Sequence, residues 1–596
     1  MSAASQTGSG PPLRSRQWIV PRIDEAAARE LANAVGVGLP AARVLWNRGL
    51  RDAATVKRFL RPSIDDLNDP FALLGMQAAV ARLRRAIASG EQILIYGDYD
   101  VDGTTSVVIL KKAIELAGGK ATFHIPNRLK DGYGMRPEIV VRAAADGVSL
   151  IVSVDTGIRA GEVVRRAAEL GIDVIITDHH LPETEIPPAL AVLNPNQPGC
   201  GYPDKNLCGV GVAFKLVQAL LGGMGWPPEK LRRALESFLK LVAIGTVADV
   251  VPLTGENRII VKHGLEGLHD VRNVGLRALM RIAGLEEGKS PSAGQIAFRL
   301  APRINAAGRM ASADDVIELF LTADAARAQQ IAEQLHGLNA ERQQTERQII
   351  ETILAECIAA PVGDDQAALV FAGEGWHRGV LGIVASRLVE KFHRPVFVLS
   401  HNPEDGTAQG SGRSIVIFHL MDALESMPHL FRKFGGHHHA AGLTLASLHV
   451  DEFRRTLNEY ASARLTSQDF VPMIAADAEV TLTELTDAAA AGVLALQPFG
   501  AGNSSPLFVA RDVEVAGEPC VMKDKHLRLT VRGGGKTLRM KAWNFAERAC
   551  ELTPGSRIDI AFELEEDSYS ASRGFSPWSA TLREYQPTAT SPLRFP

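Results

Sequence analysis

The residues best able to do chemistry in this 596-residue chain are acids and histidines that directly follow apolar runs. Such β-branched, apolar runs predict buried parallel strands, and ligands bind beyond the carboxyl ends of strands of this kind. We therefore expect four strand ends at one edge of a sheet. They carry Asp98, Asp100 and Asp102 in GDYDVDG, Asp155 in SVDTG, Asp178, His179 and His180 in TDHH, and Asp249 in GTVADVV.

This set of side chains favours a divalent metal site. A single acid after a strand is most often a turn or cap residue, but several buried acids without cations would repel one another. Carboxylates with two imidazoles suit Mn²⁺, with Mg²⁺ as a substitute, and this number of acids favours two ions. Two ions roughly 3.5–4 Å apart hydrolyse phosphate esters without a protein nucleophile. The chain has no GxxxxGK[ST] loop and no convincing Ser/His/Asp or Cys/His arrangement, so the pattern predicts metal-assisted phosphoester hydrolysis.

The elements that must position these residues alternate between strand and helix. Strands in QILIYGD, ATFHIPNR, VSLIVSV and IDVIIT are separated by helical patterns, which predicts a parallel α/β sheet. We expect GDYDVDG to be a loop, followed by a helix that Thr104 and Thr105 cap. From 323 to 358 the chain contains no proline, which predicts one long connector helix. A second α/β pattern starts near 367, and Gly-separated alternating strands near the end predict a small antiparallel barrel.

These patterns divide the chain into segments, in line with the roughly three or four domains expected at this length. We expect a flexible tail (1–18), an N-terminal helical region (19–89), a first α/β domain (90–315), the connector helix (316–360), a second α/β domain (361–466) and the barrel (467–596).

Composition limits the function classes. The formal net charge of −4 gives no global basic field, although 64 Lys and Arg residues can form a local one. Five scattered cysteines without a CxxC pair argue against a disulfide framework or a zinc site. There is no apolar run of membrane-spanning length and no apolar signal core near the N-terminus. We therefore expect a cytoplasmic protein.

The barrel segment concentrates positive charge. KDKHLRLTVRGGGKTLRMKAWNF holds seven Lys and Arg residues, and strand alternation places many of them on one face. Core packing is the expected role of Trp543 and Phe545, and base stacking is the alternative. A basic face with nearby aromatics fits sequence-independent binding of single strands.

The motifs GDYDVDG, SVDTG, TDHH and GTVADVVPL resemble those of the DHH phosphoesterase superfamily. With RINAAGRM, GWHRGVLGIVASRL, GSGRS and FGGHHHAAG, residues 40–585 most resemble its bacterial single-strand-specific 5′→3′ exonucleases. The resemblance implies a DHH catalytic domain, a DHHA1 domain and an OB-like barrel. It also implies two Mn²⁺ or Mg²⁺ ions held by Asp100, Asp102, Asp155, His179, His180 and Asp249. Tyr96 stands where other branches of the superfamily have a histidine ligand, and Asp98 is the candidate to replace it.

The resemblance further implies residues that hold the DNA. Among the metal ligands, Asp100, Asp155 and His180 are the expected catalytic residues. Gly410–Ser414 is expected to be a short loop that grips a terminal phosphate, and His437 lies in the motif expected to bind nucleic acid. The expected nucleic-acid and phosphate ligands are Arg128, Tyr133, Arg303, Arg309, Arg378, Ser411, Gly412, Arg413 and His437.

The expected function is hydrolysis of single-stranded DNA from its 5′ end to 5′ mononucleotides, in DNA repair and recombination. The alternative is a phosphodiesterase for oligonucleotides or cyclic dinucleotides, although a small substrate does not need a barrel domain. A non-enzymatic DNA-binding scaffold predicts broken acidic motifs, and all four are intact. The resemblance suggests single-strand-binding protein and a helicase as partners, and we expect a monomer.

Overall fold

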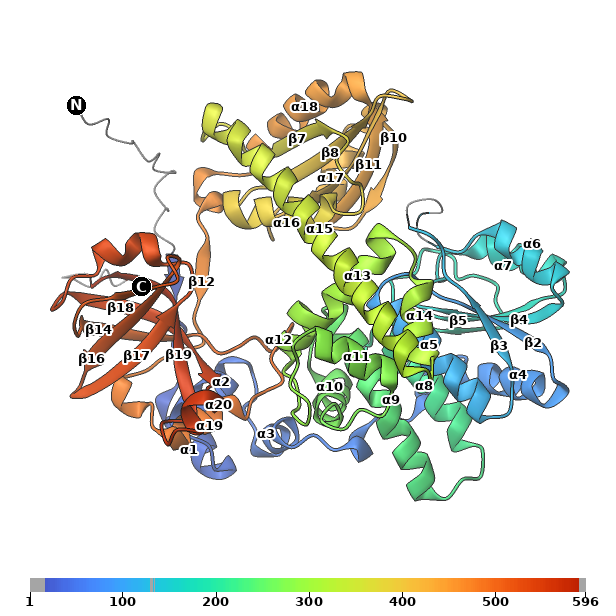
Figure 1. Cartoon of the computed structure of the whole chain (residues 1–596), viewed down its shortest axis with the longest axis horizontal. Coiled ribbons are helices and arrows are strands. Elements are labelled where there is room, and N and C mark those ends of the chain that lie inside the picture. Colours follow the sequence, from blue (N-terminus) through green and yellow to red (C-terminus); the bar gives the residue numbers. More distant parts are fainter. Residues whose placement is uncertain (1–16, 129–131, 133, 589–596) are drawn as a thin grey trace. The chain divides into compact units, whose positions relative to one another are not determined.

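A computed structural model describes residues 17–128, 132 and 134–588 (Figure 1). The chain forms two compact units. One unit, called here the barrel unit, contains the residues up to Arg61, Leu465–Gln497 and the residues from Ser505 onward. The other, the catalytic unit, contains Pro62–Arg464 and Pro498–Ser504. The predicted flexible tail lies outside the described residues, except for its last two residues, which belong to a strand.

The catalytic unit is built on a five-stranded parallel sheet in the order β3-β2-β4-β5-β6, which confirms the predicted parallel sheet. Its strands are β2 (Gln92–Tyr96), β3 (Ala121–His124), β4 (Val148–Val154), β5 (Asp173–Thr177) and β6 (Ala191–Leu193). Its helices are α4 (Met76–Ser89), α5 (Val101–Leu116), α6 (Pro137–Ala145), α7 (Gly161–Glu169), α8 (Gly209–Gly222) and α9 (Pro228–Ala248).

Successive residues of each strand point to opposite faces of this sheet, and helices cover both faces. On one face, Ile93 and Ile95 pack in a core shared with α4, α5, α8 and α9. On the other face, Leu94 and Tyr96 pack with residues of α6 and α7. Each aliphatic side chain buried in this way contributes about 1.5–3 kcal/mol. The strand register is therefore strongly specified, and the carboxyl ends of β2, β4 and β5 lie side by side.

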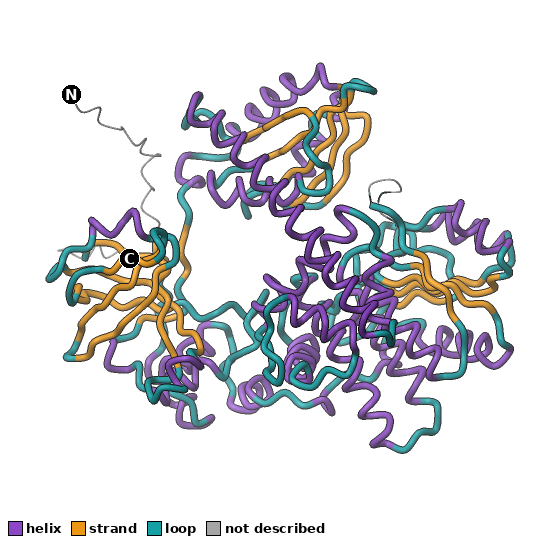
Figure 2. The backbone as a smooth tube through the Cα atoms, viewed as in Figure 1, coloured by secondary structure: helices purple, strands orange, loops and turns teal. Residues whose placement is uncertain are grey.

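A helical layer continues the catalytic unit. It contains α10 (Gly255–Gly267), α11 (Val274–Ile282), α12 (Ala293–Gln295), a π-helix (Ile296–Leu300), α13 (Ala301–Met310) and α14 (Asp314–Leu321). The predicted connector is confirmed as α15 (Ala325–Ala359), the long continuous helix in Figure 2. No helix among the described residues has the length and apolar character needed to cross a membrane.

The second α/β domain has a mixed sheet in the order β10-β11-β9-β8-β7. Its elements are β7 (Leu369–Glu374), α16 (Leu381–Phe392), β8 (Val396–Asn402), β9 (Thr407–Arg413), α17 (Leu420–Glu425), β10 (Phe431–Gly436), β11 (Ala440–Ala446) and α18 (Val450–Ser462). The prediction of a short loop at Gly410–Ser414 is wrong, because all but the last of these residues belong to β9. This strand pairs with β8 and β11 on its two sides.

The barrel unit is a closed β-barrel with helices from both ends of the chain. Its sheet has the order β13-β14-β18-β19-β17-β16-β15, and an additional pairing of β14 with β16 closes it. Its strands are β1 (Gln17–Ile19), β12 (Met473–Ala475), β13 (Ala478–Glu479), β14 (Phe508–Val515), β15 (Cys520–Met522), β16 (His526–Gly533), β17 (Lys536–Ala542), β18 (Arg557–Glu566) and β19 (Trp578–Pro587). Its helices are α1 (Glu25–Val35), α2 (Leu39–Asn47), α3 (Ala53–Leu60), α19 (Asp487–Leu494) and α20 (Ser568–Ala571).

The predicted basic face of the barrel is confirmed. Arg528 and Arg532 of β16 and Arg539 of β17 are exposed and alternate with buried apolar residues. The core role expected of Trp543 is wrong, since 45% of this residue is exposed beside the same strands. Phe545 is partly buried, and its ring centre lies 6.2 Å from that of Tyr585.

Candidate functional site

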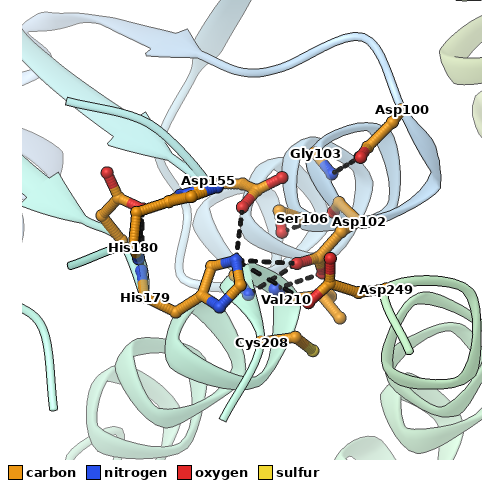
Figure 3. A network of polar contacts seen from close by, with 12 residues as sticks. Asp100, Asp102, Gly103, Ser106, Asp155, His179, His180, Cys208, Val210 and Asp249 are labelled. Carbon is orange, nitrogen blue, oxygen red and sulfur yellow. Dashed lines mark hydrogen bonds and ion pairs between the residues drawn. The ribbon is translucent and has the colours of Figure 1, made fainter. Parts of the chain in front are cut away.

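Three carboxylates surround the imidazole of His179, which follows β5 (Figure 3). Its Nε2 lies 3.3 Å from Asp155 Oδ1, 3.7 Å from Asp249 Oδ2 and 3.9 Å from Asp102 Oδ2. Asp155 follows β4 and Asp102 lies in the first turn of α5. Chain segments 53 and 94 residues apart thus bring acids to one point, as the motif pattern predicts.

Asp249 reaches this cluster from an unexpected element. We predicted that it ends a strand, but it caps the carboxyl end of α9, a 21-residue helix. The next residue, Val250, has a left-handed φ of 63°, which turns the chain sharply away from the helix. The prediction of a fourth strand end is therefore wrong, whereas the convergence of Asp249 with the other acids is confirmed.

The acidic motif after β2 is the start of a helix rather than a free loop. Asp100 is the N-cap of α5, and its Oδ1 accepts the Gly103 N–H at 3.0 Å. The expected caps Thr104 and Thr105 instead lie inside the first turns of the helix and donate back to backbone carbonyls. Carboxylates are favoured at this end of a helix because it carries partial positive charge.

A second helix terminus supports Asp102. Its two carboxylate oxygens accept the N–H groups of Gly209 and Val210 at 2.6 and 2.7 Å, where α8 begins. Asp155 packs against the same point, and it has a left-handed φ of 58°. A Cβ at Gly209 would lie only 2.5 Å from the Asp155 carboxylate, so this position requires glycine.

The cluster needs a cation. Burial, followed by repulsion from the neighbouring acids, raises the pKa of Asp102 to about 7 and that of Asp249 to about 9. Burial also lowers the pKa of His179 to about 4, which keeps its imidazole neutral. Buried atoms of Asp98, Asp155, His179 and Asp249 have no hydrogen-bond partner among the described residues. Neutral imidazole and clustered carboxylates with unpaired oxygens are the donor set of a divalent transition metal.

The possible ligand atoms fall into three overlapping groups, each within 4.8 Å. One group contains Asp102, His179 and Asp249, and a second contains Asp98, Asp100 and Asp155. The third, Asp155 with His179 and His180, shares members with both. Tyr96, in the position of the missing histidine, is buried and donates its hydroxyl to the Gly134 carbonyl at 3.3 Å.

Asp178 holds the histidines in place. Its Oδ1 lies 2.7 Å from His180 Nδ1 and accepts the backbone N–H groups of His179 and His180, while Oδ2 accepts the Ile158 N–H. Burial alone would raise the pKa of Asp178, but the hydrogen bond and charge of His180 lower it overall. The ionised carboxylate accepts a hydrogen bond from the Nδ1–H of His180, which leaves His180 Nε2 as the atom able to bind metal.

Two asparagines that the sequence patterns did not identify hold the same turn from behind. Asn196 Nδ2 donates to the His179 carbonyl at 2.9 Å, and Asn194 Nδ2 donates to the His180 carbonyl at 2.8 Å. The backbone N–H of Asn196 donates to Asn194 Oδ1 at 2.7 Å. Their signal in the sequence is the NPN triplet that directly follows β6, at the same edge of the sheet.

Asp178→Asn is expected to weaken Mn²⁺ binding about 10–100-fold, the usual cost of losing a carboxylate that orients a ligating histidine. Asparagine has one acceptor oxygen instead of two and no negative charge, so its NH₂ group faces either the Ile158 N–H or the Nδ1–H of His180, where two donors meet. Isothermal titration with Mn²⁺ measures the affinity. Asp422→Asn, which changes an exposed acid of α17 beside His419, is the control. Unchanged Mn²⁺ affinity in Asp178→Asn would contradict the orienting role.

Comparison with known proteins agrees with this arrangement. Residues 92–246 match the N-terminal domain of the DHH family, 364–463 the DHHA1 domain and 476–575 the RecJ OB domain. The single-stranded-DNA-specific exonuclease RecJ of Bacillus subtilis is 38% identical over 93% of this chain and 69% of its own length. The chain belongs to the RecJ family.

Two solved structures from Thermus thermophilus extend the match. RecJ in complex with Mn²⁺ is 32% identical and has a TM-score of 0.81, over 96% of this chain and 80% of that one. RecJ in complex with Mg²⁺ is 31% identical with a TM-score of 0.76, over 96% and 79% of the two chains. The family comparison thus agrees with the predicted DHH, DHHA1 and OB-like domain types and with a metal-dependent enzyme.

Three of the phosphate ligands predicted for this RecJ-family chain, Arg128, Arg413 and His437, are affected by nearby charged groups. The Arg128 guanidinium lies 5.1 Å from the centre of the Tyr99 ring, next to Asp98. Burial lowers the pKa of Arg413, and the positive charge of Arg128 lowers it further, so these two cations influence each other. The pKa of His437 is lowered mainly by burial and then by the charges of Arg159 and His180. The charge of Arg128 thus acts on Arg413, and the charge of His180 acts on His437.

The remaining predicted ligands are placed differently. Arg378 is exposed in the segment between β7 and α16, and Ser411 is partly buried in β9. Gly412 lies inside the sheet, and a Cβ there would meet the Phe397 ring at 2.4 Å, so its small size serves packing. Arg303 donates to the Arg299 carbonyl one turn earlier in the helix. Tyr133 lies outside the described residues.

Proposed function

We propose that this chain is an exonuclease that hydrolyses single-stranded DNA from its 5′ end to 5′ mononucleotides. The observation that carries the proposal is the group of acids within 3.3–3.9 Å of His179 Nε2, with buried ligand atoms that lack partners. RecJ-family membership gives the substrate class, since the relatives are named single-stranded-DNA-specific exonucleases.

We propose two divalent cations, Mn²⁺ or Mg²⁺. Asp102, His179 and Asp249 would hold one, and Asp98, Asp100 and Asp155 the other, with His180 beside both groups. Such ions, when bound, activate a water molecule and offset the charge that develops on the phosphate. The residues of the chain hold this site rigid, because helix termini and Asp178 fix the ligand side chains before substrate arrives.

The 5′ end is proposed to bind through a terminal phosphate. Arg413 donates to the Gly412 carbonyl at 2.8 Å and has no carboxylate within 4 Å among the described residues. Its guanidinium packs over the first turn of α16, 2.8 Å from where a Cβ of Gly382 would lie. A partly buried cation without a counter-charge, next to Arg128, suits a phosphate dianion.

Arg413→Ala is expected to remove the preference for a 5′ phosphate over a 5′ hydroxyl, by about 10–100-fold in kcat/KM, because hydrogen bonds to charged groups contribute about 1.5–3 kcal/mol. Initial rates on matched strands that differ only in this group measure the preference. Arg455→Ala, at an exposed arginine of α18, is the control. A phosphate preference that survives in Arg413→Ala would place the 5′ pocket elsewhere.

Digestion of long single strands labelled at the 5′ or the 3′ end, with Mn²⁺ or with chelator, tests the proposed function itself. Release of labelled mononucleotide from the 5′-labelled strand first, only with metal, is the expected result. Faster hydrolysis of a dinucleotide or a cyclic dinucleotide than of the long strand would favour the alternative phosphodiesterase. Binding without cleavage would favour the scaffold.

The biological setting is also proposed. We propose a cytoplasmic monomer that acts on single strands during repair and recombination, with single-strand-binding protein and a helicase as partners.

A further inference from the structure

A cavity of about 400 Å³ lies directly beside the metal cluster. Its wall includes Ala248 and Val250, the two neighbours of Asp249. Asn305 of α13 lines it as well, and its Oδ1 accepts the backbone N–H of Val101 at 3.2 Å. Since Val101 stands between Asp100 and Asp102, one wall residue of the cavity also holds the acidic motif.

The cavity is mainly apolar and carries one unusual aromatic residue. Leu253, Ala301, Ile383 and Phe499 form much of its wall. Phe298, also part of the lining, is 83% exposed, the largest exposed fraction among the large apolar residues described. It lies in the π-helix, and such turns occur frequently at functional sites. A large exposed ring beside an apolar cavity has no packing role in the fold, so it suits a flat apolar ligand.

The cavity wall also contains a cation, Arg309, which favours a ligand with negative charge. Arg309 donates to the Gly379 carbonyl at 3.2 Å, with no carboxylate within 4 Å among the described residues. Burial, followed by the charges of Arg128 and Arg342, lowers the pKa of Arg309 to about 10. Arg342, the other cation of the lining, is already paired with Glu346 at 3.0 Å. Arg309 therefore lacks a counter-charge that a ligand could supply.

We propose that this cavity binds a nucleobase of the single strand, stacked on Phe298, while Arg309 holds an adjacent phosphate. Flat rings on aromatic side chains and phosphates on cations are the usual means of binding single strands without reading their sequence. The inference rests on the proposed exonuclease function and adds a base-binding subsite to it. Because the cavity lies next to Asp249, a base bound in it lies near the bond to be cleaved.

DNA strands with a single abasic nucleotide, placed at successive positions from the 5′ end, test this subsite. Each strand lacks one base but keeps every phosphate, so only base binding is changed. With Mn²⁺, the wild-type chain is expected to lose about 5–150-fold in kcat/KM at one position, the usual value of one stacked base. Phe298→Ala should lose a similar factor on normal strands and become insensitive to the abasic residue at that position. Phe298→Trp should restore the sensitivity. Because the Phe298 ring is mainly exposed, neither change should affect folding.

Leu448→Ala, at a leucine that is 79% exposed in the second α/β domain, is the matched control and should behave as the wild type. A Phe298→Ala chain that keeps the wild-type kcat/KM, or stays sensitive at the same position, overturns the inference. If the wild type cleaves no single strand, the proposed function fails first. In that case, the fluorescence of strands that contain 2-aminopurine, bound in the presence of chelator, tests base binding in the cavity without cleavage. Quenching in the wild type that is lost in Phe298→Ala supports the inference. Equal quenching in both proteins rejects it.

Discussion

Asp155→Asn is expected to abolish Mn²⁺-dependent hydrolysis of single-stranded DNA, by at least about 10³-fold, since a bound ion contributes several kcal/mol to the transition state. Asp155 is fully buried, and its Oδ1 lies 3.3 Å from His179 Nε2 without a hydrogen-bond partner. It belongs to two of the three possible ligand groups, so its loss removes a ligand from both. Asparagine has the same shape and tolerates the left-handed φ of 58° at this position.

Thermal unfolding with and without Mn²⁺ separates a lost metal site from a damaged fold. Without metal, Asp155→Asn should be at least as stable as the wild type, because it removes one charge from a group of mutually repelling acids. With Mn²⁺, the wild type should gain stability and the variant should gain much less. Asp451→Asn, at an acid whose side chain is 91% exposed, should match the wild type in both assays. Full Mn²⁺ stabilisation of Asp155→Asn would refute its role as a ligand.

Glu256→Gln is expected to destabilise the catalytic unit by about 3–5 kcal/mol, because it leaves a buried ammonium without its counter-charge. Lys215 is fully buried in α8, and its Nζ lies 2.7 Å from Glu256 Oε1. The same carboxylate accepts the Tyr202 hydroxyl at 2.5 Å and the backbone N–H of Asn68 at 3.1 Å. One carboxylate thus ties together α8, α10 and the segment before α4.

Urea unfolding, followed by a signal from the catalytic unit, measures this loss. Adding Lys215→Met to Glu256→Gln should recover much of it, since replacing both charges of a buried pair is often neutral. Glu266→Gln breaks a half-exposed pair with Lys262 on the same helix and should cost less than about 1 kcal/mol. If Glu256→Gln costs no more than Glu266→Gln, the buried pair does not stabilise the fold as argued.

Local patterns were enough to predict the sheet that carries the site. The strands before Asp98, Asp155 and Asp178 are continuous apolar runs with both faces buried, and such runs leave few alternatives to a parallel sheet. The ends of these strands must meet at one edge, so the convergence of their acids followed.

Elements whose local pattern is ambiguous were predicted less well. The run before Asp249 is as apolar as a strand, but it continues a helix buried against α5, and periodicity alone does not separate the two. Gly410 and Gly412 suggested a loop, whereas they are small because Leu399 and Phe397 of β8 pack where their side chains would be. In both cases a tertiary neighbour, distant in sequence, decides the structure.

Contacts between the ends of the chain were beyond any local pattern. Arg43 of α2 pairs with Glu484 at 2.9 Å and donates to the Glu479 carbonyl at 3.1 Å. A Cβ at Gly38 would come within 2.9 Å of Ala489 in α19. The helices before Arg61 thus complete the barrel unit, in which they pack with residues more than four hundred positions later.

The pairing of β1 with β12 constrains the order in which the chain can fold during synthesis. Gln17 pairs with Met473, which the ribosome adds 456 residues later. At about 5–20 residues per second, the first strand waits roughly 20–90 s for its partner, and during that time the ribosome makes Pro62–Arg464, the main part of the catalytic unit. During this interval α2 exposes the surface that α19 covers in the finished protein, so the N-terminal helices stay incomplete until the end of the chain is made.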